Sequence, residues 1–323
     1  MQVFDSGKVY DFMGKKALGF AVSCVLVIGS IFLLSTRGLN YGIDFAGGTL
    51  IQVRYDAPAP LDAIRAKFET NEVLKNASVT EFGSKEEITI RYAGSSDSLG
   101  SDPAGVVSNL LADTGKFEVR RVDVVGPKVG SELREKGVMA LTVSLVLILV
   151  YIAFRFEWRF GLAAILGEFH DVIISLGLIS LLRIDVNLDT LAAILTIIGY
   201  SLNDTIIVFD RIREGVQTSK QSNLNAVINE SVSATLPRTV MTSVTTLLSV
   251  TTLFLFGGDM IHGFSTIMLV GVVVGTLSSI FIAAPMLVWF KFSVESYRAH
   301  LYELEKKRKE KEKIRAMYEK GTI

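Results

Sequence analysis

Six apolar segments, each long enough to cross a bilayer, constrain the fold of this chain more than any other feature. The chain has 323 residues, half of them apolar, and its mean hydropathy of +0.43 is too high for an ordinary soluble domain. We therefore predict an α-helical membrane protein with six transmembrane helices. The segments are residues 17–35, 138–154, 161–182, 190–209, 239–256 and 264–290.

Basic residues predict which side of the membrane each connection faces, because Lys and Arg are enriched in cytoplasmic loops. They gather before the first segment, after the second and fourth segments, and in the tail 291–323. The loops after the third and fifth segments carry Arg183 alone. We therefore expect both termini, 1–16 and 291–323, to be cytoplasmic. The long loop 36–137 then lies outside the cytoplasm, and 138–290 forms the main membrane domain.

The loop 36–137 is long enough to fold by itself, and its pattern is that of an α+β unit. A break in the alternation at Arg120-Arg121 interrupts its last strand. The order β-α-β-β-α-β is typical of a ferredoxin-like domain. Alternating apolar residues predict strands at 51–55, 79–82, 88–92 and 117–125, and helical spacing predicts helices at 61–68 and after Asp102-Pro103.

Two further segments are expected on the cytoplasmic side. Apolar residues at helical spacing in 221–236 predict an amphipathic helix that lies along the membrane surface. The tail from Tyr302 is rich in Lys and Glu and predicts a solvated helix that supports the topology. Docking of this basic tail on a ribosome or on anionic lipid is the alternative interpretation.

Asp204 is the most informative single residue, because it lies inside the apolar segment 190–209. Its position is about 6 Å from the middle of that segment, toward the cytoplasm, at 1.5 Å per residue. Ionisable residues inside membrane spans are costly and are functional by default. We therefore expect Asp204 to bind a proton or an ion, with Ser201 and Asn203 as hydrogen-bonding neighbours. The alternative is a neutral Asp204 that only bonds an adjacent helix.

Arg238 precedes the fifth apolar segment and admits two interpretations. It either extends to the cytoplasmic interface as a topology residue, or it reaches inward to Asp204.

Gly271 and Gly275 form a G-x-x-x-G pattern in the last segment. This pattern favours close packing of two helices.

The third apolar segment holds Glu168, His170 and Asp171 near its middle. Glu168 and Asp171 are three residues apart and share one helix face. His170 titrates near physiological pH, so it either relays protons or holds Asp171 in place. No third set of ligands accompanies them, so we expect no metal site.

No motif for nucleotide chemistry or for catalysis is present, because the Gly-Lys pairs lack the preceding Gly of a P-loop. We therefore expect no enzyme activity and no cofactor. If the chain does work, the source is an ion gradient of H⁺ or Na⁺, since one charge crossing 100 mV yields about 2.3 kcal/mol.

A series of motifs resembles the SecF members of the SecDF family of protein-export subunits, within the RND superfamily. The motifs follow the family's order along nearly the whole chain. They are Gly-Ile-Asp-Phe-Ala-Gly-Gly-Thr at 42–49, Val-Gly-Pro-Lys-Val-Gly at 125–130, Phe-Arg-Phe-Glu-Trp-Arg at 154–159, His170-Asp171, Gly-Tyr-Ser-Leu-Asn-Asp-Thr at 199–205, Phe-Asp-Arg-Ile-Arg-Glu at 209–214, Leu-Pro-Arg-Thr at 236–239 and Leu-Phe-Gly-Gly at 255–258.

The resemblance implies a subunit of the bacterial inner membrane, with 36–137 in the periplasm. It implies that the chain works with SecD beside the SecYEG channel, on preprotein whose translocation SecA has begun. Proton-motive force would then drive motion of the outer domains that hold preprotein. Asp204 and Arg238 match the family's membrane carboxylate and the basic residue implicated with it.

Two other functions stay open from the sequence. An RND-type exporter of small molecules or lipids would need paired outer subdomains, for which the loop 36–137 is small. A scaffold that only stabilises a translocon complex would use Asp204 as a structural bond. Replacing Asp204 by Asn separates coupling from scaffolding, because a scaffold survives the change if assembly does.

Overall fold

A computed structural model of the chain describes residues 8–72, 74–75, 77–92, 102–219 and 221–319. Within these residues, six helices are long and apolar enough to cross a membrane, which confirms the six predicted spans. The last span contains a π-helical stretch. The helices are α1 (Lys16–Arg37), α5 (Pro127–Arg155), α6 (Trp158–Leu182), α7 (Leu188–Thr218), α8 (Leu224–Phe256), and α9 (His262–Ser278), which continues through η4 (Ser279–Ala283) into α10 (Ala284–Trp289).

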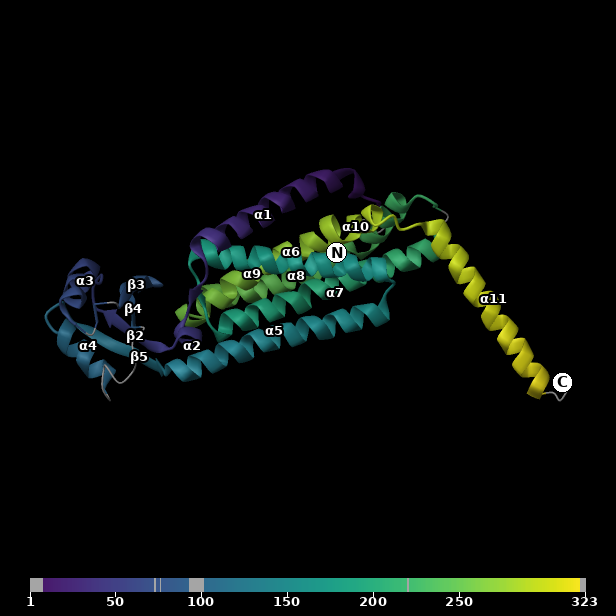
Figure 1. The fold of residues 1–323 in the computed structure, drawn as a ribbon. Helices are drawn as coiled ribbons and strands as arrows, with labels where there is room; N and C mark the ends of the chain where they lie inside the picture. Colours follow the sequence, from purple (N-terminus) through teal and green to yellow (C-terminus); the bar gives the residue numbers. More distant parts are fainter. Residues whose placement is uncertain (1–7, 73, 76, 93–101, 220, 320–323) are drawn as a thin grey trace.

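Three helices form the buried centre of the bundle, and the other three expose apolar surface at its sides. In α6, α7 and the α9–α10 span, 56%, 50% and 61% of the apolar stretch is buried, against 6%, 11% and 17% in α1, α5 and α8. Figure 1 shows α1 and α5 on opposite sides of the central helices. A mixed domain lies at one end, and helix α11 (Val294–Glu319) extends from the other. We call these the domain end and the tail end.

The mixed domain is a four-stranded antiparallel sheet with two helices, and its strand order is β3-β4-β2-β5. Its element order, β-α-β-β-α-β, is the one that the sequence predicts. The elements are β2 (Gly48–Tyr55), α3 (Leu61–Thr70), β3 (Ser78–Phe82), β4 (Ser84–Tyr92), α4 (Pro103–Leu111) and β5 (Phe117–Val125).

Local features of this domain follow from its sequence. The Asp102 carboxylate accepts a hydrogen bond from the Gly105 amide at 2.9 Å and caps α4, as the Asp-Pro pair predicts. Opposite Gln52 and Val53, the pairing passes from Arg121 to Val119 and leaves Arg120 as a bulge. The β3–β4 hairpin is tighter than expected, because Gly83 adopts a φ of +70° and β4 begins directly after it.

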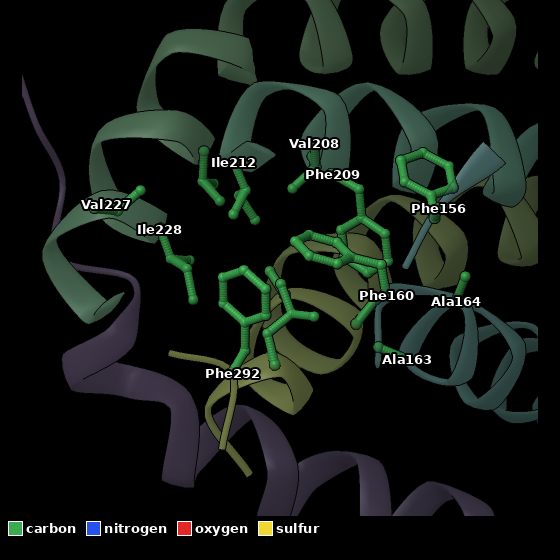
Figure 2. Close-up of a cluster of buried hydrophobic side chains, with 14 of the residues drawn as sticks. Phe156, Phe160, Ala163, Ala164, Val208, Phe209, Ile212, Val227, Ile228 and Phe292 are labelled. Carbon is green, nitrogen blue, oxygen red and sulfur yellow. The ribbon is translucent and has the colours of Figure 1, made fainter. Parts of the chain in front are cut away.

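The segment 221–236 differs from its predicted form, because α8 runs without interruption through Pro237 to Phe256. The apolar stripe of Val227, Ile228 and Val232 is fully buried. Figure 2 shows Val227 and Ile228 pointing into one cluster with Ile212 of α7 and with Phe292. The stripe is therefore covered by protein and does not lie on a membrane surface.

Side chains tie the chain ends to the tail end of the bundle. Asn229 of α8 accepts hydrogen bonds from the backbone amides of Phe12 and Met13 at 3.0 and 2.9 Å, so it caps the first span from another helix. Arg298 of α11 donates to the carbonyls of Val216 and Ser219 at 2.6 and 2.5 Å, where α7 ends. The spans α1, α7 and α8 and the start of α11 thus form one connected unit.

Candidate functional site

Two facing helices place four buried polar residues in the centre of the bundle. Glu168 and Asp171 of α6 and Ser201 and Asp204 of α7 are each no more than 3% exposed. The two helices meet at the domain end and run antiparallel. Three residues of helix advance about 4.5 Å along the axis. Asp171 bonds Ser201, so Glu168 and Asp204 both lie about one turn nearer the tail end.

Asp171 is saturated with hydrogen-bond donors. Its carboxylate accepts from the Ser201 hydroxyl at 2.5 Å and from the Ser278 hydroxyl at 2.7 Å. The Nδ1 atom of His170 lies 2.8 Å from its other oxygen. Three helices, α6, α7 and α9, are therefore joined at one buried carboxylate. Donors of this kind stabilise the ionised form of a buried carboxylate.

Close packing of α9 on α7 brings Ser278 to this carboxylate. A Cβ atom added at Gly275 would lie 2.9 Å from the Cβ of Ser201, so only glycine fits this approach. Gly271, one turn away, packs against Ile197 of α7 in the same way. The G-x-x-x-G pattern thus sets the distance at which Ser278 and Asp171 meet.

A π-helical stretch begins directly after Ser278, at Ser279–Ala283. Such stretches occur mostly as single turns inside α-helices, frequently at functional sites. The sequence analysis did not select Ser278 as a site residue. The adjacent serines 278 and 279, inside an otherwise apolar span, are the signal that marks this position.

Unlike Asp171, Glu168 and Asp204 are buried without hydrogen-bond donors among the described residues. Neither oxygen of either carboxylate has a hydrogen-bond partner among the residues that the structure describes. The hydroxyl of Thr239, on α8, is also buried without a partner in that part of the chain. An ionised carboxylate without partners is very costly to bury, so such groups hold a proton or a cation.

Arg238 is exposed, which agrees with its interpretation as an interface residue. It lies inside the continuous helix α8 and is exposed, next to the buried Thr239. Within the described residues, no ion pair joins it to Asp204, although its charge acts on that carboxylate. Arg238 is therefore a cation that influences the Asp204 carboxylate without contacting it.

The structure separates the other predicted neighbours. Asn203 is exposed, because adjacent helix residues point in different directions, and it lies away from the buried cluster. His170 is 11% exposed in its side chain, and its Nε2 atom has no partner in the described chain. His170 therefore holds Asp171 through its Nδ1 atom.

A second polar chain links three helices beside the first. The Tyr200 hydroxyl donates to Ser243 at 3.1 Å, and Ser243 shares a 2.7 Å hydrogen bond with Thr276. These residues come from α7, α8 and α9. The chain gives α8 a specific contact to the central helices, which its mainly exposed apolar face does not provide.

Comparisons with known proteins agree on one family. A family model described as "Protein export membrane protein SecD/SecF, C-terminal" matches residues 106–293, and one described as "SecD/SecF GG Motif" matches residues 32–59. A "Protein translocase subunit SecF" of Helicobacter pylori (strain ATCC 700392 / 26695) is 44% identical over the full length of both chains. One of Vibrio alginolyticus is 44% identical over 88% of this chain and 91% of its own.

Two solved structures are similar to this chain. The crystal structure of SecDF, a translocon-associated membrane protein from Thermus thermophilus, matches with a TM-score of 0.82 at 36% identity. The match covers 90% of this chain and 40% of that longer one. SecDF in its super-membrane-facing form matches with a TM-score of 0.66, also at 36% identity, over 95% and 41% of the two chains. At equal identity, the second form differs more from the arrangement seen here.

Proposed function

Because this chain belongs to the SecF family and is a membrane subunit of the Sec protein translocase, we propose that it couples proton movement through its helix bundle to motion of its outer domain. The observation that carries the proposal is Asp204. Its carboxylate is 1% exposed and has no hydrogen-bond partner in the described chain. A group of this kind changes its electrostatic energy strongly when it gains or loses a proton.

The contrast with Asp171 supports a division of roles. Asp171 is held by Ser201, Ser278 and His170, so fixed hydrogen-bonding groups surround its carboxylate and it joins α6, α7 and α9. Asp204 has no such donors. We assign Asp171 to holding the three helices together and Asp204 to carrying the exchanged proton.

Proton exchange at Asp204 has a direct consequence for helix packing. Without a proton, the carboxylate attracts Arg238 of α8. With a proton, that attraction disappears. Since Asp171 fixes α6, α7 and α9 to one another, the change acts between this group and α8. A bistable packing between helices is a known route from a small local change to a large motion.

Glu168 and His170 extend the pathway from Asp204. Glu168 lies beside Ser201, whose single hydroxyl proton is donated to Asp171. We propose that a protonated Glu168 moves to donate to the Ser201 oxygen during exchange, so that a chain from Glu168 through Ser201 and Asp171 to His170 passes a proton toward the domain end.

We infer the partners from the resemblance to the family. The matched SecDF chain is longer than this one, which covers 40% of it, and we assign the other half of the pair to SecD. The pair acts beside SecYEG on preprotein that SecA has begun to move. Both termini are cytoplasmic in the inner membrane, and the mixed domain faces the periplasm.

Selective removal of each ion gradient tests the proposed coupling. In inverted membrane vesicles that contain this chain and SecD, a protonophore should remove the gradient-dependent part of preprotein translocation. A sodium ionophore should leave it intact, because the exchanged ion is H⁺. Protease-protected preprotein is the measurement. Loss with the sodium ionophore alone would assign Na⁺ instead, and no loss with either would reject ion coupling.

A further inference from the structure

The connection between α6 and α7 touches both the entry segment and the sheet of the outer domain. Strand β6 (Asp185–Val186) lies in this connection and pairs in parallel with β1 (Asn40–Tyr41), which leads from α1 into the domain. The Gly42 amide donates to the Val186 carbonyl at 2.9 Å. The connection is therefore bonded to the domain's entry segment through its backbone.

One carboxylate in this connection holds two parts of the domain at once. Asp185 accepts hydrogen bonds from the side-chain amide of Asn40 and from the guanidinium of Arg91. Arg91 belongs to β4, in the interior of the sheet order. Its side chain is 20% exposed and that of Asp185 is 31% exposed. An ion pair shielded from solvent in this way is screened less than a surface pair.

Further contacts make the same connection stiff. Asp44, in the short helix α2 (Ile43–Ala46), accepts from the Leu188 amide at 3.1 Å, at the first turn of α7. Asn187 caps α7 by accepting from the Thr190 amide at 2.9 Å, and the Thr190 hydroxyl donates to the Asp185 carbonyl at 2.7 Å. Asp185 is thus fixed to the beginning of α7 by its own backbone.

The domain therefore has two kinds of attachment. Its covalent links run to α1 and α5, the flanking helices, which the buried carboxylate cluster does not include. The Asp185 contacts run to α6 and α7, which carry Glu168, Asp171 and Asp204. The bond between Asp185 and Arg91 joins the sheet of the domain to the helices on which the proposed proton exchange occurs.

We propose that Asp185 is a positioning residue that locks β4 of the outer domain to the α6–α7 connection as a rigid joint, so that movement of α6 and α7 is transmitted to the domain. The inference rests on the proposed function. It adds a route of transmission, and it requires that the bond between Asp185 and Arg91 stays closed while the domain moves.

Replacing Asp185 by Ala tests this joint, with Asp113→Ala as the matched control. Asp113 pairs with Lys67 at an exposed site of the same domain. In vesicles with a proton gradient, Asp185→Ala should reduce translocation to the level without a gradient, while proton entry into proteoliposomes stays at the wild-type level. Asp113→Ala should change neither. Wild-type translocation by Asp185→Ala would overturn the joint.

A crosslink separates a joint from a merely stabilising contact. Arg91→Cys combined with Asp185→Cys, in a Cys24→Ala background, should be as defective as Asp185→Ala. A short bis-maleimide that links the two thiols should restore gradient-dependent translocation. Failure of the crosslinked protein to translocate would overturn the proposal that the joint stays closed. If Asp204→Asn were also without effect on translocation, the proposed function itself would be at fault, independently of the joint.

Discussion

Asp204→Asn is expected to abolish the gradient-dependent part of preprotein translocation and to leave the remainder unchanged. The substitution preserves the size of the side chain and removes only its ability to gain and lose a proton. Neither Asp204 oxygen has a hydrogen-bond partner in the described chain, so no bond is lost with it. The measurement is protease-protected preprotein in inverted vesicles, with and without the gradient.

Asp189→Asn is the matched control for this substitution. Asp189 lies on the same helix, in its first turn at the domain end, and is exposed. The Asp189→Asn protein should support the same preprotein translocation as the wild type at equal expression. Normal gradient-dependent export by Asp204→Asn would show that the chain acts as a scaffold and that Asp204 is a structural residue.

Asp171→Ala is expected to have the largest effect on folding. It removes the hydrogen bonds that Asp171 makes with the Ser201 and Ser278 hydroxyls and the His170 ring, and leaves Ser278 with its bond to the Gly275 carbonyl. Interhelical hydrogen bonds in membranes contribute about 0.6 to 2 kcal/mol each. Loss of the three bonds should therefore lower the free energy of unfolding by about 2 to 6 kcal/mol. Thermal unfolding of the purified SecD complex in detergent measures this effect.

Glu168→Gln provides the comparison for Asp171→Ala. Glu168 lies one turn away on the same helix and is equally buried, but its oxygens have no hydrogen-bond partner in the described residues. Its replacement should leave the melting temperature close to that of the wild type. Equal destabilisation by the two substitutions would contradict the distinct roles assigned to these carboxylates.

The carboxylates of the site were predictable because an ionisable residue in an apolar segment is visible in sequence. Asp204, Glu168 and Asp171 stand out against their neighbours for this reason. Their different roles were not visible, because they depend on which donors face them. Ser278 reaches Asp171 only through the rotation of α9, which close packing at Gly275 sets.

Adjacency in sequence was a poor guide to adjacency in the helix. Asn203 follows Leu202 and precedes Asp204, yet it is exposed while Asp204 is buried. In the same way, the stripe at 227–232 carries one apolar pattern whether lipid or another helix covers it. The extension of α7 to Thr218 supplies the covering surface, and no local signal in 221–236 reveals that.

The mixed domain was predicted more completely, because short strands and their turns are encoded locally. The break at Arg120-Arg121 and the cap at Asp102 both occur where the sequence places them. The contact between Arg91 and Asp185 joins residues 94 positions apart. Opposite charges are too common in loops for such a pair to be selected without the fold.

Proton entry into proteoliposomes tests the central claim most directly. Vesicles containing this chain with SecD, and a pH-sensitive dye inside, are given a membrane potential that draws protons inward. The wild-type protein should acidify the interior, and Asp204→Asn should acidify it no faster than protein-free vesicles. Equal proton entry with the wild type and with Asp204→Asn would contradict the assignment of Asp204 as the residue that carries the proton.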